Sequence, residues 1–480
     1  MAVLEGLSPE RVFHYFEEIS SIPRGSGNMD GIATYCMAFA KKQGLKAVRD
    51  EADNVVIYKP ASKGFENAET VILQGHLDIV CQKTEESQID FEKDGLELLV
   101  EGDYVTANGT TLGADNGIAV AMVMAILEDK EAEHPAIEAL FTTDEEIGMI
   151  GAGKLDGSLF HGKKLINLDA EEPELLTVSC AGGSDLVMQV PIQPETVQGT
   201  KITVTVKGLS GGHSGVEIHK GRVNSNVLMG RVLAYAKTAG DFRLISVNGG
   251  DKANAIPLCT VAELVTENGA ELKDKMTAYM EIVKSEISDR EPGFFYEVTS
   301  GDEGVYAVMD KDAQKKLSFV LLAAPDGVQD MSVTIPDLVE TSLNMGILKT
   351  EAENAIMHFA LRSNKKTALM ALEDKLCAMA EFSGIPVECF GHYPPWEFKE
   401  NSELQKLYKE TYCEKTGVEP KVVAIHAGLE CGVLSDKIPG LDCIAIGPEA
   451  KDVHTVHEAV RISSIEEIYE IVKNLLKKCR

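Results

Sequence analysis

Ionisable side chains follow apolar, strand-like runs at three points in the first part of the chain. His76 and Asp78 come just after the first run, Glu145 and Glu146 after the second, and Asp169 after the third. Because the carboxyl ends of neighbouring parallel strands open into one crevice, these side chains are expected to lie close together. Imidazole and carboxylate groups gathered in this way can bind divalent cations and can also transfer protons.

Two more residues complete a candidate ligand set. Asp115 opens an apolar helix, and His454 lies near the C-terminus, followed four residues later by Glu458. Zn²⁺, Mn²⁺ and Co²⁺ accept mixed nitrogen and oxygen ligands, whereas Mg²⁺ and Ca²⁺ prefer oxygen alone. Five ligands, one of them able to bridge, predict two metal ions about 3.5–4 Å apart. The predicted ligands are His76, Asp115, Glu146, Asp169 and His454.

Two neighbouring acids are expected to assist without binding metal. Asp78 follows His76 in extended backbone, so its side chain projects on the same side and can orient the imidazole. Glu145 adjoins a predicted ligand and can take a proton from an attacking water. Since consecutive side chains of a strand point in opposite directions, Glu145 and Glu146 are expected to have different roles.

Each motif also has an ordinary structural interpretation. A His-x-Asp pair at a strand end is usually incidental, and Asp115 in front of a helix can be a simple N-cap. Glu145 and Glu146 can form a solvated face, and Asp169 lies in an acidic loop. The combination of all these residues at successive strand ends favours a metal site over the separate explanations.

The elements that must position these residues alternate between strands and helices over the first part of the chain. Such alternation predicts an α/β domain with a mostly parallel central sheet, covered by helices on both faces. A chain of 480 residues is too long for a single hydrophobic core, so two domains are expected. The predicted strands are Val55–Tyr58, Thr70–Leu73, Ile137–Thr143 and Lys164–Leu168, and the predicted helices are Met29–Gln43 and Gly117–Asp129.

The pattern changes at Lys201, where apolar and polar residues begin to alternate as in half-buried strands. Helical patterns follow and predict a separate α+β domain. After Pro394 and Pro395 the chain returns to apolar strands of the α/β type. We therefore predict that residues 1–190 and 390–480 form the metal-binding domain and that residues 191–389 are inserted into it.

Composition excludes several classes of partner and location. The formal net charge of −30 argues against nucleic acid or an anionic membrane surface as a partner. No run approaches the ~20 apolar residues of a membrane-spanning helix, and the N-terminus predicts a helix capped by Ser8, not a signal peptide. The 10 cysteines include no CxxC pair, which suits free thiols in a reducing compartment. A cytoplasmic location is expected.

Several motifs together resemble peptidase family M20, and within it the branch of the aminoacyl-histidine dipeptidases. The resemblance covers essentially the whole chain in the same order, and TTLGADNG and HAGLECG are specific to that branch. The matching segments are HLD, TTLGADNG, DEE, INLDAEE, GGHSGVEIH, HAGLECG and a final H-x-x-x-E.

The resemblance implies a zinc-peptidase-type catalytic domain with an inserted lid domain, and it implies roles for the metal-binding residues. Asp115 would bridge the two metals, with His76 and Asp169 on opposite ions and a cis peptide after Asp115. Glu145 would be the general base, and Asp78 would orient His76. The residues after the last ligand differ from those of the branch, where a Ser-Pro pair often follows that ligand. Here Thr455-Val456 follows, and His457 is a rival to His454, but Glu458 then fits the family spacing only for His454.

The resemblance also assigns residues of the inserted domain. His213 would stabilise the developing oxyanion, and Arg362 would bind the free α-carboxylate of the substrate through two parallel hydrogen bonds. Asn254 would help to hold the substrate, and Gly428 would bring backbone close to it. Without the resemblance these residues have ordinary interpretations as turn or strand-end residues.

The activity implied is metal-dependent hydrolysis of dipeptides with free termini, notably Xaa-His dipeptides of the carnosine type. Two divalent metal ions per chain are expected, with zinc first and cobalt or manganese as substitutes. One alternative is an N-acyl-amino-acid amidohydrolase or carboxypeptidase of the same family, and another is a non-catalytic metal-binding homologue. For the oligomeric state, a homodimer is the usual expectation for such enzymes.

Overall fold

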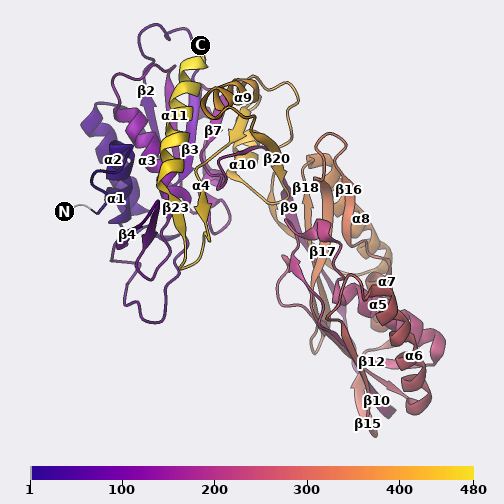
Figure 1. The fold of residues 1–480 in the computed structure, drawn as a ribbon. Helices are drawn as coiled ribbons and strands as arrows, with labels where there is room; N and C mark the ends of the chain where they lie inside the picture. Colours follow the sequence, from indigo (N-terminus) through magenta and orange to yellow (C-terminus); the bar gives the residue numbers. More distant parts are fainter. Residues whose placement is uncertain (1–2) are drawn as a thin grey trace. The chain divides into compact units, whose positions relative to one another are not determined.

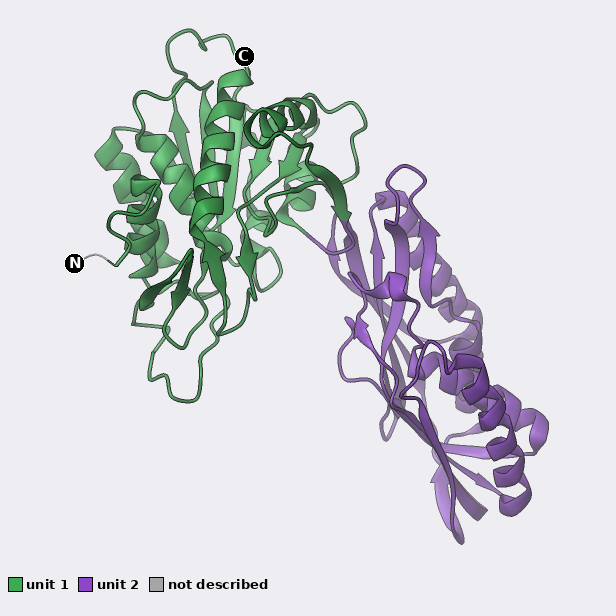
Figure 2. Ribbon diagram, in the orientation of Figure 1, with its two compact units in different colours: residues 1–180, 396–424, 429–480 green, residues 181–395, 425–428 purple. Residues whose placement is uncertain are grey.

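The computed structural model describes residues 3–480 (Figure 1). These residues form two compact units (Figure 2). Unit 1 comprises Met1–Cys180, Trp396–Ala424 and Leu429–Arg480, and unit 2 comprises Ala181–Pro395 and Ile425–Gly428. The first boundary therefore lies before 190, because strand β9 (Gly182–Pro191) pairs within the sheet of unit 2. The function of the inserted segment as a lid stays a prediction.

Unit 1 is built on a mixed sheet of eight strands in the order β1-β2-β6-β3-β7-β21-β8-β20. The four central strands β6, β3, β7 and β21 run parallel to their neighbours in this group. The pairings β1–β2, β2–β6 and β21–β8 are antiparallel. The strands are β1 (Lys46–Arg49), β2 (Val55–Lys59), β3 (Val71–His76), β6 (Ile137–Thr142), β7 (Lys164–Asn167), β8 (Leu175–Cys180), β20 (Lys421–Ile425) and β21 (Asp442–Ala445).

A second, four-stranded sheet in unit 1 has the order β22-β23-β5-β4. Its hairpin β22–β23 contains the loop of His454. The strands are β4 (Leu98–Glu101), β5 (Tyr104–Ala107), β22 (Ala450–Lys451) and β23 (Ala459–Arg461).

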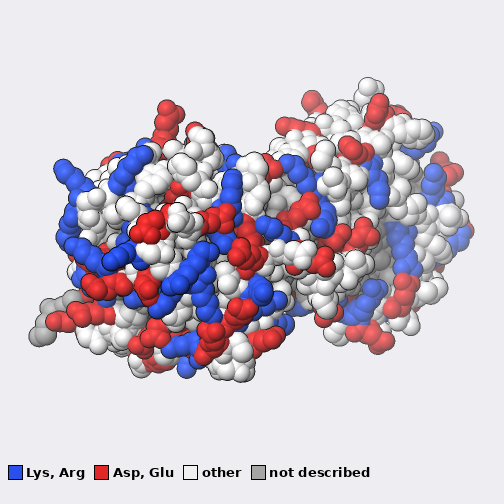
Figure 3. Space-filling model, turned by 90° about the horizontal axis from the view of Figure 1, so that it is seen from above, with Lys and Arg blue, Asp and Glu red and all other residues white. Residues whose placement is uncertain are grey.

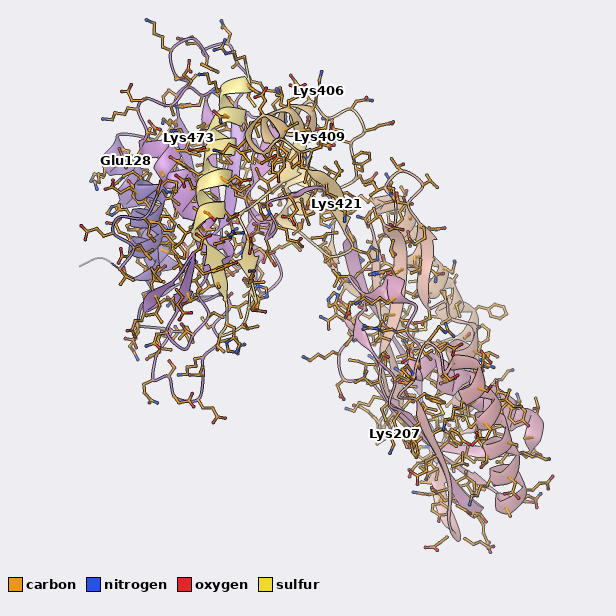
Figure 4. All side chains as sticks on the ribbon, in the orientation of Figure 1. Glu128, Lys207, Lys406, Lys409, Lys421 and Lys473 are labelled. Atoms are coloured by element: carbon orange, nitrogen blue, oxygen red, sulfur yellow. The ribbon has the colours of Figure 1, made fainter. Side chains whose placement is uncertain are left out.

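The helices of unit 1 are joined by buried apolar surfaces and by ion pairs at their ends. In helix α3 every residue from 116 to 127 is buried, as expected for a helix that is apolar all round. Glu128 at its end accepts a hydrogen bond from Arg11 of α1 at 2.5 Å. The next residue, Asp129, pairs with Lys473 of α11 at 2.7 Å (Glu128 and Lys473 are labelled in Figure 4). The helices are α1 (Glu10–Ser20), α2 (Asp30–Gln43), α3 (Ala114–Glu128), α4 (Ile150–Lys154), η1 (Gly157–Leu159), α9 (Glu403–Thr416), α10 (Glu430–Lys437) and α11 (Ile462–Lys478).

The predicted cap of the first helix is wrong. Helix α1 begins at Glu10 with Pro9 in the N-cap position and without a capping side chain. The Ser8 hydroxyl instead donates a hydrogen bond to Glu466, at 2.8 Å. Ser8 lies one residue too early to reach the free N–H groups of the first turn.

Unit 2 is an α+β structure with a long antiparallel sheet in the order β15-β10-β14-β12-β17-β18-β9-β19, and β16 also pairs with β17. Helices α5 to α8 lie along one side of this sheet (Figure 1). The strands are β9 (Gly182–Pro191), β10 (Glu195–Lys207), β12 (Arg243–Gly249), β14 (Thr260–Thr266), β15 (Phe295–Val308), β16 (Gly327–Met331), β17 (Val339–Thr350), β18 (Asn354–Ser363) and β19 (Val387–Tyr393). The helices are η2 (Ile218–Lys220), α5 (Ser225–Ala239), α6 (Gly269–Ile287), α7 (Lys311–Ala323) and α8 (Lys366–Ser383).

One hydrophobic cluster joins this sheet to its helices. It contains Val204 and Phe359 from the strands and Met229, Met276 and Leu317 from the helices, all almost without exposed surface. The expectation of an α/β part with a second, α+β part is confirmed.

Two further features of the structure concern the charges on its surface and the length of its helices. Lysine and arginine side chains are interspersed with aspartate and glutamate over the face shown in Figure 3, so the positive charge on that face is not gathered in one patch. Within residues 3–480, no helix has the length and apolar character needed to cross a membrane.

Candidate metal centre

The five predicted metal ligands lie at the ends of elements that unit 1 brings together. His76 is the last residue of β3, and Glu146 and Asp169 follow the neighbouring strands β6 and β7. Asp115 is in the first turn of α3, and His454 lies in the loop between β22 and β23. His454 has a positive φ of 63°, a conformation that is uncommon outside glycine and that occurs at functional sites.

The two carboxylate oxygens of Asp115 face two different histidines. Its Oδ1 lies 3.0 Å from His76 Nε2, and its Oδ2 lies 3.1 Å from His454 Nε2. Each imidazole has a second carboxylate beside it. Asp169 Oδ1 is 3.5 Å from His76 Nε2, and Glu146 Oε1 is 3.1 Å from His454 Nε2. The donors therefore form two groups that share Asp115.

This grouping bears on two predictions: that His76 and Asp169 bind opposite metals, and that His454, not His457, is the last ligand. His76 and Asp169 fall in the same group, so the distances favour one metal for both and not opposite metals. Both histidines are exposed, but Nε2 of His454 faces Asp115 and Glu146, whereas the hydrogen bond of His457 is one from its backbone N–H to the hydroxyl of Thr455. His454 as the last ligand stays a prediction, and its place beside Asp115 and Glu146 is the reason to prefer it over His457.

The residues fit a pair of divalent cations. One donor atom each from His76, Asp115 and Glu146 lie within 4.8 Å of one another. A shared carboxylate with an imidazole and a carboxylate on each side is the mixed nitrogen and oxygen set that Zn²⁺, Co²⁺ and Mn²⁺ accept.

Asp115 does not cap its helix. The helix has no side-chain cap at its first residues, and Asp115 has non-helical angles next to a cis peptide bond to Asn116, as predicted. The N–H groups of the helix start are satisfied by Glu458, whose carboxylate accepts hydrogen bonds from Leu112, Gly113, Ala114 and Asp115 at 2.8–3.3 Å. The carboxylate of Asp115 is thereby left for the two histidines.

Asp78 links His76 to both glutamates. Its backbone carbonyl lies 3.0 Å from His76 Nδ1, with one carboxylate oxygen at 3.6 Å. The carboxylate accepts hydrogen bonds from the backbone N–H groups of Glu145 and Glu146 at 3.0 and 3.2 Å and from the Ser26 hydroxyl at 2.8 Å. It therefore orients the imidazole and also fixes the segment that carries the predicted base.

The alternation argument for Glu145 and Glu146 does not apply. Strand β6 ends at Thr142, and the chain turns sharply at Asp144, whose φ is 52°. Glu145 then accepts hydrogen bonds from the backbone N–H groups of Gly148 and Met149 through its own carbonyl. The different surroundings of the two side chains come from this turn and from Asp78, not from a strand.

Carboxylates outnumber cations at the centre, and the pKa values reflect this. Burial lowers the pKa of His76, but Asp169 and Asp115 outweigh that effect and raise the pKa well above its usual value. Hydrogen bonds with Asp115 and Glu146 raise the pKa of His454 to about 10. Burial raises the pKa of Asp169 to about 6 and that of Glu145 to about 9. A buried cluster of this kind requires positive charge nearby to keep its carboxylates ionised.

A separate cluster in unit 2 contains His213. This residue lies on β11 (Gly212–His213), which pairs with β13 (Ala255–Ile256). Its Nδ1 accepts hydrogen bonds from the backbone N–H groups of Gly215 and Val216 at 3.1 and 3.2 Å. Burial and the nearby Arg362 lower the pKa of His213. The ring is thus held neutral with its proton on Nε2, which makes Nε2 a hydrogen-bond donor.

Asn254 is held next to His213 by its backbone. Its carbonyl accepts a hydrogen bond from the N–H of Ser214 at 2.9 Å. The buried side chain of Asn344 donates to the carbonyls of Ala253 and Ala255 at 3.0 and 2.9 Å. These bonds fix both sides of Asn254.

Arg362 is a partly buried cation at the end of β18. No carboxylate among residues 3–480 lies within 4.0 Å of its guanidinium. Its Nη1 donates to the hydroxyl of Tyr393 at 2.9 Å, and its buried Nε has no hydrogen-bond partner within the same range of residues. Donors without an internal acceptor leave this guanidinium able to bind an external carboxylate.

Gly428 ends the short segment Ile425–Gly428 that the chain contributes to unit 2. In this segment His426 is buried, with hydrogen bonds to Ser342 at 2.7 Å and to Asn364 at 3.2 Å. Burial lowers the pKa of His426 to about 3. The structure thus brings His213, Asn254 and Arg362 together with this segment in unit 2, and the metal ligands, Asp78 and Glu145 in unit 1.

Sequence reasoning missed residues that support the centre. Arg24 is 2% exposed and donates to the carbonyls of Leu77 and Gly113 at 2.9 and 2.6 Å. It thereby ties the loop of His76 to the start of the helix of Asp115. An arginine in a segment rich in proline and glycine is expected at the surface, so the sequence carries no signal for this role. Tyr393 beside Arg362 was also missed.

Comparison with known proteins now identifies the family. Residues 72–478 match the model of peptidase family M20/M25/M40.

The chain belongs to peptidase family M20.

The resemblance seen in the sequence is confirmed by full-length relatives of this M20 peptidase. It is 36% identical over 485 residues to the "Cytosol non-specific dipeptidase" of Escherichia coli (strain K12), covering 100% of this chain and 99% of that protein. It superimposes on the crystal structure of "Aminoacylhistidine Dipeptidase from Vibrio alginolyticus" with a TM-score of 0.94 and 36% identity, covering 99% of this chain and 98% of that one.

A more distant structure shows the fold alone. The aminopeptidase PepT from Bacillus cereus ATCC 10987 has a TM-score of 0.57 and 15% identity, with 98% of this chain and 99% of that chain covered. Members of the M20 family are dinuclear metal-dependent peptidases. The expectations of an enzyme and of a peptidase are therefore confirmed.

Proposed function

We propose that this M20 peptidase is a dipeptidase with two metal ions, which hydrolyses short dipeptides that have free termini. The observation that supports the proposal most is the carboxylate of Asp115, whose two oxygens face His76 and His454. A single carboxylate shared between two imidazole and carboxylate pairs is the donor arrangement that a dinuclear hydrolase needs.

The residues proposed to hold the metals are those of the two donor groups. His76 and Asp169 belong to one metal, Glu146 and His454 to the other, and Asp115 to both. Zinc is the proposed metal, with cobalt or manganese able to replace it, because all three accept mixed imidazole and carboxylate ligands. When bound, the two cations supply Lewis acidity, which polarises a carbonyl oxygen and makes water a stronger acid.

Glu145 is the proposed general base. Its segment is held by the carboxylate of Asp78, which accepts the N–H groups of Glu145 and Glu146. From this position Glu145 takes a proton from the attacking water and passes it to the leaving amine. Asp78 keeps the imidazole of His76 in the orientation that directs Nε2 toward Asp115.

Unit 2 is proposed to recognise the substrate and to act as the lid. The neutral ring of His213 has its proton on Nε2, so it can donate a hydrogen bond to the oxyanion that develops during attack. Arg362, which has no internal carboxylate, is proposed to bind the α-carboxylate of the dipeptide. Asn254 and Gly428 are proposed to contact the rest of the substrate.

The substrate class follows from Arg362 and from the relatives. A guanidinium site for a free carboxylate favours short peptides with an unblocked C-terminus. The names of the two full-length relatives refer to dipeptides in general and to aminoacyl-histidine. We therefore propose a broad dipeptidase that includes Xaa-His substrates, acts in the cytosol as its Escherichia coli relative is named to do, and has small dipeptides as partners. A homodimer stays a prediction.

A dipeptide panel tests the proposed function. The metal-free protein is titrated with Zn²⁺, Mn²⁺ and Co²⁺ and assayed against β-alanyl-histidine, other Xaa-His and Xaa-Leu dipeptides, N-acetyl amino acids and longer peptides. Unblocked dipeptides are expected to be cleaved only after metal is added. Cleavage of N-acetyl amino acids in preference to dipeptides would favour an amidohydrolase, and stable metal binding without any cleavage would favour a non-catalytic homologue.

A further inference from the structure

Unit 1 contains a chain of four polar side chains that have no exposed surface. Gln74, Thr142, Asn167 and Glu430 are each 0% exposed. The Glu430 oxygen Oε2 accepts hydrogen bonds from Gln74 Nε2 at 2.6 Å and from Thr142 Oγ1 at 2.7 Å. Gln74 in turn accepts a hydrogen bond from Asn167 Nδ2 at 2.6 Å. The network joins three neighbouring strands to the start of helix α10.

The network holds each of the three strands by a residue that lies shortly before a predicted metal ligand or the predicted base. Gln74 lies on β3 shortly before His76, and Asn167 ends β7 shortly before Asp169. Thr142 ends β6, and the turn that carries Glu145 follows it. Fully buried polar networks specify one arrangement of the elements that they join, since a broken bond leaves a polar group without water. The spacing of these three strand ends is therefore set by the network.

Glu430 also carries an oxygen without a partner. Its Oε1 is buried and has no hydrogen-bond partner among residues 3–480, and no lysine, arginine or histidine in that range lies within 4.0 Å of the carboxylate. Burial raises the pKa of Glu430 to about 7, and the charge of the nearby His76 opposes this rise. A buried negative charge that is not paired inside the protein is destabilising, and a nearby divalent cation is one group that can compensate it.

We propose that Glu430 is a positioning residue of the metal centre. Through Gln74 and Thr142 it fixes the distance between the strand ends that carry His76, Asp169 and Glu145, and its charge increases the attraction of the centre for cations. The inference rests on the proposed metal site. It adds a residue whose side-chain hydrogen bonds go to Gln74 and Thr142 and not to the predicted ligands. Residues that orient metal ligands in this indirect way typically change metal affinity by about 10–100-fold when they are replaced.

The test compares Glu430→Gln with a matched control, Glu138→Gln. Glutamine keeps the size of the side chain and an acceptor for Gln74 and Thr142, and it removes the charge. Glu138 is a second buried glutamate in unit 1, near the opposite end of β6, where it accepts hydrogen bonds from the backbone N–H groups of His161 and Gly162. Zn²⁺ affinity is measured by competition with a chelator, and the thermal unfolding midpoint is measured on the metal-free proteins.

A loss of at least tenfold in Zn²⁺ affinity in Glu430→Gln, with less than threefold in Glu138→Gln, is the expected result. A smaller loss, or a similar loss in both variants, overturns the proposal. A purely structural glutamate would lower the unfolding midpoint without changing affinity, which is the result expected for Glu138→Gln. If Glu430→Gln does not fold, Gln74→Met takes its place and is judged by the same tenfold criterion. This replacement removes the three hydrogen bonds of the Gln74 amide, to Glu430, Thr142 and Asn167, at similar volume. Failure of the wild-type protein to bind metal would instead refute the metal centre itself.

Discussion

Replacing Glu145 by glutamine is expected to lower kcat by about 10²–10⁴-fold, the range for losing a positioned acid–base group. The amide keeps the size of the side chain but cannot accept the proton. Both metal ions should stay bound, because the backbone of this segment is held by Asp78 and the ligands are unchanged. Steady-state kinetics of an unblocked dipeptide, together with elemental analysis of the purified variant, measures both effects.

The neighbouring replacement, Glu146→Gln, is the control for this result. It should lower metal affinity, because Glu146 is one of the carboxylates beside His454, and its activity should return in part at high metal concentration. The assignments would have to be exchanged if Glu145→Gln lost metal while Glu146→Gln kept it. If both variants kept the metal content and the activity of the wild type, neither residue would have a role in the reaction.

Replacing Arg362 by alanine is expected to lower kcat/KM for unblocked dipeptides. The loss of transition-state stabilisation should be about 2–4 kcal/mol, the scale for losing one partner of a buried charged pair. This corresponds to roughly 30- to 1,000-fold. The reason is that Arg362 has no carboxylate of its own among residues 3–480 and would pair with that of the substrate. Dipeptides with an amidated C-terminus should be poor substrates of the wild type and should be little affected by the replacement.

Arg231→Ala provides a matched control in the same unit. Arg231 is a half-buried arginine on α5 that already pairs with Glu286 at 2.6 Å. Its replacement should leave kcat/KM unchanged for both free and amidated dipeptides. Equal sensitivity of free and amidated substrates to Arg362→Ala would exclude Arg362 from carboxylate recognition.

Much of the catalytic fold could be predicted because the apolar runs are short and their ends are marked by ionisable residues. The strands of His76, Glu146 and Asp169 are adjacent in the sheet, and the crevice at their carboxyl ends follows from parallel pairing. The sequence could not show which donors share a metal, because that depends on the rotation of each side chain. Asp169 was expected on the metal opposite to that of His76, but its carboxylate lies beside the imidazole of His76.

The contacts of the supporting residues could not be predicted, since their partners are distant in the sequence. Glu458 was marked by its spacing from His454, but not as the acceptor of backbone N–H groups at the start of α3. Arg24 and Glu458 bind backbone groups that any sequence could provide. Glu430 is bonded to Gln74 and Thr142, which precede it by hundreds of residues. The turn at Asp144 was also hidden, because an aspartate with positive φ looks the same in sequence as one in a strand.

The most direct test of the central claim is the number of metal ions bound per chain, measured by calorimetric titration of the metal-free protein with Zn²⁺ and checked by elemental analysis. Asp115 is the residue that faces both donor groups, so the wild type should bind two equivalents and Asp115→Asn at most one with comparable affinity. A wild type that binds a single ion, or an Asp115→Asn variant that still binds two ions as tightly, would contradict a centre bridged by Asp115.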